Sequence, residues 1–264
     1  MADKLEGIDS FIRRELMRAA IERSQDVDML SMMPGSTEAQ AKRFDDVEEM
    51  LNIPYVNREE VPLAMDVFKP ADAEGKELPV VVTIHGGGFT MGDRRISRPF
   101  GRLLAHKGYL VFSVEYRLAP KVSISQGLDD VCCGLDLVGE RLVDFDVDFN
   151  RVFMVAESAG AYLAAYACAM GGSQKLQDAI GHQASRMKFK AAAFNCGMFY
   201  TNEDDPCGKM LSEQIYGNQR FDQTFLEYMN PEHPEIINNL PPAYIFTSRA
   251  DFLNNYSFKL HDAL

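Results

Sequence analysis

Short runs of apolar residues alternate with stretches of mixed polarity from residue 61 to the end of the sequence. The run LPVVVTI at 78–84 is continuously apolar and β-branched, which is typical of a strand buried on both faces. The segment at 159–170 is alanine-rich and long enough to form a helix. Strands that alternate with helices predict βαβ units, and therefore a mostly parallel sheet with helices on both faces. The predicted strands are residues 61–68, 78–84, 109–116, 151–157, 190–197 and 243–248, and the predicted helices are residues 98–107, 126–142 and 159–170.

Residues 1–30 have a helical pattern instead. Apolar residues recur there at spacings of three and four, as on one face of an amphipathic helix: Leu5, Ile8, Ile12, Leu16 and Ala19. Acidic residues are interspersed with the arginines of this segment, so we expect it to pack on the protein's own body rather than on a membrane. Residues 51–264 form the predicted α/β core. Within it, residues 200–240 are polar and punctuated by proline, which predicts an excursion between two strands rather than a separate domain.

Composition excludes several classes of protein. The 264 residues include 27 Lys+Arg and 39 Asp+Glu, a formal net charge of −12, which argues against a nucleic-acid-binding surface. The N-terminus lacks the apolar core of a secretory signal, and no apolar run approaches the ~18 residues that span a bilayer. We therefore expect a cytoplasmic protein without stable membrane anchoring. Five cysteines without a C-x-x-C pair favour neither a disulfide framework nor a zinc site.

The sequence Ala156-Glu157-Ser158-Ala159-Gly160 lies where a predicted buried strand meets the alanine-rich helix. A serine on such a strand-to-helix turn projects its hydroxyl above the sheet edge, and the close approach of strand and helix requires small residues two positions away on either side. Ala156 and Gly160 satisfy that requirement, with alanine in place of the first glycine of G-x-S-x-G. The helix N-terminus at Ala159 supplies N–H groups and a dipole that favours negative charge. Ser158 is therefore a candidate nucleophile.

A second motif, His85-Gly86-Gly87-Gly88-Phe89, follows the predicted strand at 78–84 directly. Consecutive glycines let the backbone approach a ligand closely and direct N–H groups toward it. Acyl transfer needs such donors, because its tetrahedral intermediate has an oxyanion. A phosphate-binding loop is the alternative, but neither G-x-x-x-x-G-K-[ST] nor G-x-G-x-x-G is present. We expect His85 to be a hydrogen-bonding residue of this loop rather than a catalytic base.

Together these motifs resemble the hormone-sensitive-lipase-like carboxylesterases with an HGGG loop, a branch of the α/β-hydrolase fold. The resemblance extends from about residue 61 to the end and includes HGGGF at 85–89, EYRLAP at 115–120, AESAG at 156–160 and PPAYIFTSRADFL at 241–253. It implies an α/β-hydrolase fold with an N-terminal helical lid formed by residues 1–50. Met29, Met32 and Met33 are then candidates to line the acyl pocket, although methionine more commonly fills a gap in a core. It also implies that Ser158 is the nucleophile and Asp251 the triad acid, and that the N–H groups of Gly86, Gly87 and Ala159 form the oxyanion hole.

The histidine of the triad is not evident. In this fold the order is serine, acid, histidine, and typical element lengths place the histidine roughly 25–30 residues beyond the acid. The sequence ends at Leu264, and only His261 follows Asp251. Its apolar neighbours have helical spacing, so we expect His261 to lie on a helix that leads away from the site. His233 precedes the acid, in the excursion, and nothing else in the sequence supports it as the base.

Two explanations differ in class. In the first, the chain is a serine carboxylesterase for short-chain esters whose C-terminal strand, helix and histidine are missing from this sequence. In the second, it is a catalytically silent relative that binds a small ligand in the same pocket. The first is favoured, because a binding protein has no reason to retain the strand-to-helix turn at Ser158 (the nucleophile elbow), the glycines of the oxyanion hole and the acid together. Neither explanation implies a metal or an organic cofactor; the expected partner is a small-molecule ester, and homo-oligomerisation is left open.

Overall fold

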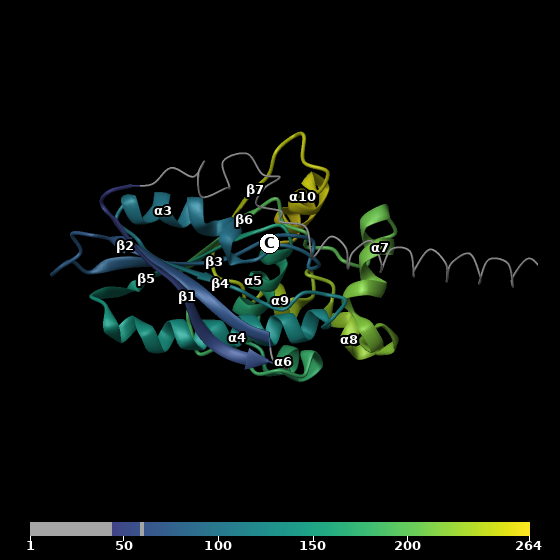
Figure 1. Cartoon of the computed structure of the whole chain (residues 1–264). Helices are drawn as coiled ribbons and strands as arrows, with labels where there is room; N and C mark the ends of the chain where they lie inside the picture. The colour runs from purple at the N-terminus through teal and green to yellow at the C-terminus, as the bar shows by residue number, and fades with distance from the viewer. Residues whose placement is uncertain (1–43, 59–60) are drawn as a thin grey trace, which may run out of the picture.

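A seven-stranded mixed sheet forms the centre of the molecule, in the order β1-β2-β4-β3-β5-β6-β7 (Figure 1). The structure is a computed structural model that describes residues 44–58 and 61–264. Strands β1 and β2 pair antiparallel, as do β2 and β4, and the remaining pairs are parallel. The strands are β1 (Val47–Arg58), β2 (Val61–Pro70), β3 (Leu78–Ile84), β4 (Leu110–Val114), β5 (Val147–Glu157), β6 (Ala191–Asn195) and β7 (Ala243–Phe246).

Helices cover both faces of this sheet. One face is covered by α3, which packs on β2 and β4, and the opposite face by α4 and α5 together with α6 and α9 (Figure 1). The helices are α3 (Arg98–His106), α4 (Ile124–Arg141), α5 (Ala159–Met170), α6 (Gln174–Ile180), α7 (Pro206–Ile215), α8 (Gln223–Tyr228), α9 (Pro234–Ile237) and α10 (Asn254–Ala263), with short 3₁₀ turns η1 (Arg94–Ser97), η2 (Leu142–Asp144) and η3 (Gly217–Phe221).

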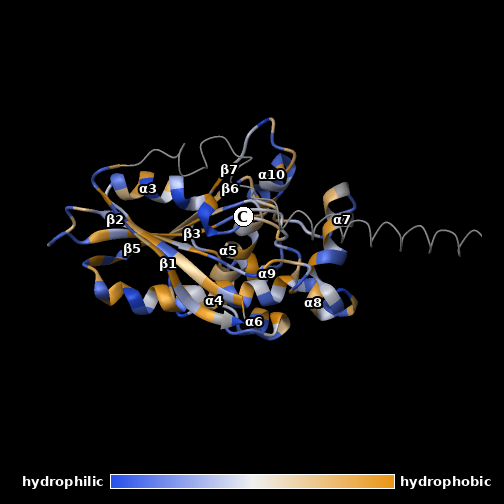
Figure 2. Cartoon of the chain, viewed as in Figure 1, coloured by the Kyte–Doolittle hydropathy of each residue, from blue (hydrophilic) through white to orange (hydrophobic). Residues whose placement is uncertain are grey.

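The two faces of the sheet have cores of very different size. The α4/α5 face has a large cluster of buried side chains, whereas the α3 face has a small one, made of Phe68, Val81, Ala105 and Val111. Figure 2 shows the same distribution, with the central strands mainly hydrophobic and α3 alternating between hydrophilic and hydrophobic residues. Helix α5 is buried along nearly its whole length, because it lies between the sheet and the helices of the excursion. The packing of α5 therefore fixes the position of the helix start, which follows the carboxyl end of β5.

The architecture agrees with the predicted mostly parallel sheet covered by helices on both faces, and it is an α/β-hydrolase fold. Predicted strand 78–84 and predicted helix 159–170 coincide with β3 and α5. Strand β1 was not predicted. Because it begins at Val47, the sheet includes residues 47–50, which the pattern assigned to the N-terminal segment. The predicted helix and lid at 1–43, with Met29, Met32 and Met33, lie outside the described residues.

The excursion between β6 and β7 contains α7, α8 and α9 and packs against α5 and α10. The hydroxyl of Tyr166, on α5, donates to the carbonyl oxygen of Tyr228 at 2.8 Å. From α10, the Lys259 ammonium contacts Glu203 at 2.7 Å and lies 4.1 Å from the centre of the Tyr200 ring. These contacts join the excursion to α5 and to α10.

Candidate active site

Ser158 occupies a strained turn between β5 and α5, with a backbone φ of 51° and ψ of −119°. A left-handed φ at a residue with a side chain costs of order 1–3 kcal/mol, and such strain is concentrated at functional sites. A Cβ at Gly160 would lie 2.4 Å from the carbonyl oxygens of both Ile84 and His85, so only glycine fits there. Ala156 is buried in the sheet with its methyl group accommodated. The elbow therefore tolerates alanine at the first position of the motif and requires glycine at the second.

The glycine loop after β3 packs directly against this elbow. A Cβ at Gly86 would lie 3.2 Å from the Cβ of Ser158 and 3.1 Å from the carbonyl oxygen of Glu157. Gly87 has a φ of 122°, and a Cβ there would lie 1.9 Å from the carbonyl oxygen of Met91. Because β3 and β5 are neighbours in the sheet, their carboxyl ends bring the two sequence motifs together.

Three backbone N–H groups at this junction have no hydrogen-bond acceptor within the described part of the chain, namely those of Gly86, Gly87 and Ala159. Ala159 is the first residue of α5, where helix geometry leaves the N–H groups unpaired and the dipole favours negative charge. The hydroxyl of Ser158 also has no partner among the described residues. Unpaired donors beside a free hydroxyl are the arrangement that addition to a carbonyl group requires.

Asp251 lies in the loop that follows β7. Its carboxylate accepts hydrogen bonds from the hydroxyl of Thr247 at 2.9 Å and from the N–H of Leu253 at 3.1 Å. The thiol of Cys196 lies close by, and its pKa is raised, first by burial and then by the Asp251 carboxylate. The same loop after β6 contacts the elbow, because the N–H of Met198 donates to the carbonyl oxygen of Ser158 at 3.1 Å. Ser158 and Asp251 thus lie on either side of the 196–198 loop.

No histidine hydrogen-bonds to Ser158 or Asp251, and all five histidines belong to the described residues. On α10, the side chain of His261 is 74% exposed and contacts Asp262. The ring of His233 accepts from the N–H of Glu235 at the start of α9. The remaining contacts are those of His85 with the carbonyl oxygen of Gly86, His106 with Asp46, and His182 with Asp129.

The loop that begins EYR is clamped by two ion pairs. The Arg94 guanidinium contacts Glu115 at 2.5 Å, and Arg117 forms a double contact with the buried Asp130 at 2.8 and 3.0 Å. Between them, Tyr116 stacks on the ring of His85 with 4.3 Å between centroids and 11° between planes. The sequence motif indicated the importance of this loop, but the residues opposite it, Arg94 and Asp130, had no signal of their own.

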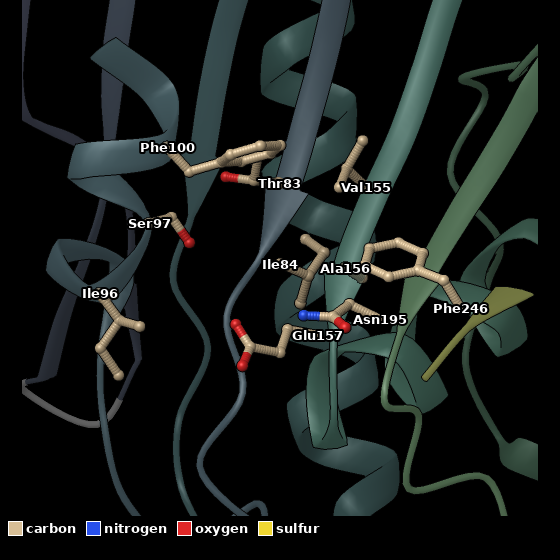
Figure 3. Close-up of a pocket in the computed structure, with 10 residues that line it drawn as sticks. All are labelled: Thr83, Ile84, Ile96, Ser97, Phe100, Val155, Ala156, Glu157, Asn195 and Phe246. Carbon is tan, nitrogen blue, oxygen red and sulfur yellow. The ribbon is translucent and has the colours of Figure 1, made fainter. Parts of the chain in front are cut away.

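A cavity of about 270 Å³ opens beside the elbow, on the α3 face of the sheet. Figure 3 shows the rings of Phe100 and Phe246 pointing toward each other across β3 and β5, with Glu157 and Asn195 below them. Burial raises the pKa of the Glu157 carboxyl. Ser158 is not one of the lining residues, so Glu157 points into a different space from its neighbour.

The aromatic residues that follow β6 are packed into the core. Phe199 is fully buried against Phe194, and Tyr200 against Tyr256. Across residues 44–58 and 61–264, no group of three or more His, Cys, Asp or Glu side chains is arranged to hold a metal ion. Over the same residues, no helix combines the length and hydropathy needed to cross a bilayer.

Known proteins similar to this chain include esterases and parts of much larger enzymes. The 5-methylorsellinic acid synthase of Aspergillus terreus is 44% identical over 114 residues, which are 39% of this chain and 4% of the synthase. The isoprenylcysteine alpha-carbonyl methylesterase ICME of Arabidopsis thaliana is 25% identical over 229 residues, 84% of this chain and 53% of that enzyme. The chain thus spans about half the methylesterase and a small part of the synthase.

Solved structures show the same fold. Esterase B of Lactobacillus rhamnosis superposes with a TM-score of 0.80 at 22% identity, over 96% of this chain and 82% of that chain. The family model BD-FAE matches residues 65–257, which include the glycine loop, the elbow and Asp251. With most of its length matched in this way, the chain belongs to the BD-FAE family of α/β-hydrolase-type esterases.

Proposed function

We propose that this chain hydrolyses short-chain carboxylic esters through an acyl-enzyme formed on Ser158. The observation that supports this most directly is the close approach of Gly86 to Ser158, where a Cβ added at Gly86 would lie 3.2 Å from the Cβ of Ser158. This packing sets unpaired N–H donors beside the free hydroxyl. Esterase activity in the family and a structural neighbour solved with a C4-C4 SN3 tributyrin phosphonate support the reaction class. The carboxylesterase assignment within the HGGG branch rests on the sequence motifs alone.

In the proposed reaction, the Ser158 oxygen attacks the ester carbonyl carbon and loses its proton to a base. The carbonyl oxygen becomes an oxyanion, which accepts hydrogen bonds from the N–H groups of Gly86, Gly87 and Ala159. Collapse of this intermediate expels the alcohol, which takes up the proton, and leaves the acyl group on Ser158. Water then repeats the addition, releases the acid and restores the serine.

The base is the part of this mechanism that the five histidines do not supply, because each has its contacts elsewhere. We propose that Asp251 serves to orient an imidazole base placed between its carboxylate and Ser158, as the third member of a triad does. Without that base, we expect the chain alone to turn over slowly, since general base catalysis typically contributes about 10²–10⁴-fold.

Imidazole added to the solution can test this assignment. We expect hydrolysis of 4-nitrophenyl butyrate by the parent chain to rise with imidazole concentration, above the imidazole-only rate. Ser158→Ala should remove all of the protein-dependent increase, and Asp251→Asn should lower it about tenfold or more. The imidazole-only rate and Ser158→Ala are the controls for hydrolysis by imidazole itself. A protein-dependent rate that Ser158→Ala leaves unchanged would exclude Ser158 as the nucleophile.

The alternative is a protein that binds a small ligand at the same place without turnover, and the engagement of all five histidines elsewhere favours it. In that case, a short-chain ester or its product should raise the melting temperature of the parent. An aryl phosphonate should then leave Ser158 unlabelled even with imidazole present. Labelling of Ser158, detected by mass spectrometry of the peptide, would exclude this alternative.

A further inference from the structure

The proposed oxyanion donors belong to peptide groups whose carbonyl oxygens are each held by a hydrogen bond. In a trans peptide the C=O and N–H point in opposite directions, so fixing the oxygen of one peptide also fixes the direction of its N–H. The N–H of Gly86 shares a peptide with the carbonyl of His85, and the N–H of Gly87 shares one with the carbonyl of Gly86. Hydrogen bonds to these two carbonyl oxygens can therefore fix the orientation of both N–H donors.

Two side chains hold these two carbonyl oxygens. The hydroxyl of Tyr116 donates to the carbonyl oxygen of His85 at 3.0 Å. The Nδ1 of His85 lies 2.8 Å from the carbonyl oxygen of Gly86. Because a carbonyl oxygen can only accept, Nδ1 must hold the hydrogen, which fixes the tautomer of this histidine.

We propose that Tyr116 and His85 are positioning residues that orient the N–H groups of Gly86 and Gly87 for oxyanion binding. This inference rests on the proposed function, because it assigns these side chains a part in the same reaction. Neither side chain touches the reacting atoms. Tyr116 acts on the first donor directly, and it acts on the second through the ring of His85, on which it stacks.

The local sequence explains why such anchors are needed. Three consecutive glycines leave the backbone without intrinsic preference, so the direction of their N–H groups must be imposed from outside. Both anchors are almost fully buried, with Tyr116 3% and His85 1% exposed, and water does not compete for their hydrogen bonds. A carbonyl that accepts a hydrogen bond also polarises its own peptide, which makes the N–H a better donor.

Tyr116 is itself fixed from both sides along the chain. Glu115 is held by Arg94, and Arg117 by the buried Asp130, so the backbone at Tyr116 has little freedom. The third donor has an anchor of the same kind, made by backbone alone, since the carbonyl oxygen of Ser158 accepts from the N–H of Met198 at 3.1 Å. All three candidate donors are thus anchored through their carbonyl oxygens.

Burial keeps the His85 ring neutral over the relevant pH range, because it lowers its pKa to about 4. The charged groups that act on the ring are Asp93, which raises this pKa, and Arg94, which lowers it. Its Nε2 is buried and has no partner among the described residues. The ring therefore acts as a donor through Nδ1 only, and no proton transfer is assigned to it.

Tyr116→Phe tests the first anchor, since it removes the hydroxyl and keeps the stacked ring. In the imidazole-supplied assay we expect kcat to fall about tenfold with KM within twofold, less than the 10²–10³-fold typical for loss of a whole oxyanion donor. Tyr166→Phe is the matched control, because that buried hydroxyl also donates to a backbone carbonyl but lies outside the site. An unchanged kcat in Tyr116→Phe would overturn the proposal.

A second readout is independent of hydrolysis. The amide resonances of Gly86 and Gly87 should shift, and their hydrogen exchange should accelerate, in Tyr116→Phe and not in Tyr166→Phe. His85→Asn, whose amide can replace the Nδ1 donor, should retain most of the activity, whereas His85→Leu should not. If Ser158→Ala leaves hydrolysis unchanged, the proposed function fails. The amide resonances would then test, independently of hydrolysis, whether Tyr116 orients the glycine N–H groups. Unchanged glycine resonances in Tyr116→Phe would refute that orientation.

Discussion

At Gly160, a hydrogen atom in place of a side chain lets α5 begin directly against the carbonyl oxygens of Ile84 and His85. Gly160→Ala would place a Cβ 2.4 Å from both oxygens, and the backbone atoms cannot rotate away. We expect the free energy of unfolding to fall by about 1–3 kcal/mol, the usual cost of overpacking, in urea denaturation.

The matched control is Gly139→Ala in the last turn of α4. A Cβ there would meet only the flexible end of the Met187 side chain, at 3.1 Å. Since alanine is the better helix former by about 1 kcal/mol, this variant should be neutral or stabilised. Equal losses in both variants would contradict the steric argument at Gly160.

His85 gives the stability of the protein a predictable pH dependence. Burial lowers its pKa from 6.5 to about 4, so between these values the unfolded chain binds more protons than the folded protein. The contribution of neutral His85 to the free energy of unfolding is fully present above about pH 6.5 and falls as the pH falls. Once the pH is below both pKa values, the total loss is roughly 3 kcal/mol.

The variant that checks this is His85→Asn, which cannot titrate. Urea denaturation from neutral pH to about pH 4 should show a steeper acid loss of stability for the parent than for the variant, with a difference in slope of up to ~1.4 kcal/mol per pH unit. Parallel curves would mean that His85 is not neutral and buried as described.

Sequence patterns identified the residues at the turn and in the glycine loop, because their chemistry depends on local spacing. Gly86 and Ser158 could be paired as motifs, but the contact between them depends on the adjacency of β3 and β5. Tyr116 could not be assigned to His85 for the same reason: the stacking of their rings depends on the packing of two loops. The roles of Ser158 and Asp251 in catalysis stay predictions.

At the scale of elements, a buried ionic cluster joins β2 to η1 and α3. Asp66 is completely buried and pairs with Arg94 at 3.1 Å and with Arg98 at 2.7 Å. The same carboxylate accepts from the N–H of Asn52 in β1 at 2.8 Å. The positions of η1, α3 and β1 relative to β2 therefore depend on one carboxylate.

Asp66→Asn tests that dependence, because it removes the buried negative charge that both guanidinium groups contact. We expect the free energy of unfolding to fall by about 3–5 kcal/mol, measured in urea. Asp72→Asn is the control, since Asp72 makes only an exposed pair with Lys76 and should have no measurable effect. If the two variants have the same stability, the cluster contributes nothing to holding these elements together.

The elements that are buried on both faces were the ones that the sequence pattern predicted best. Strands β3 and β4 are buried on both faces, and their apolar runs identified them in the sequence. Strand β1 has two glutamates and two asparagines and lies at an edge of the sheet, with an irregular register against β2. Such a strand has no continuous apolar pattern. The short helices of the excursion were not predicted individually, because their apolar positions contact α5 and α10, which a local pattern does not show.

At the scale of the whole molecule, net charge and exposed apolar surface have opposite effects. The net charge of −12 repels other copies at low ionic strength. Strand β7, in contrast, pairs only with β6 within the described residues, and its side chains Tyr244 and Phe246 are 69% and 39% exposed. An unpaired strand with exposed aromatic residues is prone to associate with another chain.

We therefore predict that this chain self-associates when salt screens its charge. The screening length falls from about 10 Å at 0.1 M to about 3 Å at 1 M salt, which removes the repulsion and leaves the attraction between the β7 surfaces. Sedimentation velocity should show monomers at low salt and larger species at high salt.

The variant Tyr244→Glu with Phe246→Lys keeps the net charge constant and removes both rings, so it should stay monomeric at both salt concentrations. Phe149→Lys with Phe221→Glu makes the same charge-neutral exchange at two exposed phenylalanines far from β7 in sequence, and it should associate like the parent. If the control pair also prevents association, general surface hydrophobicity is responsible rather than β7. A parent that stays monomeric at high salt would show that the four residues of β7 are too short to pair between chains.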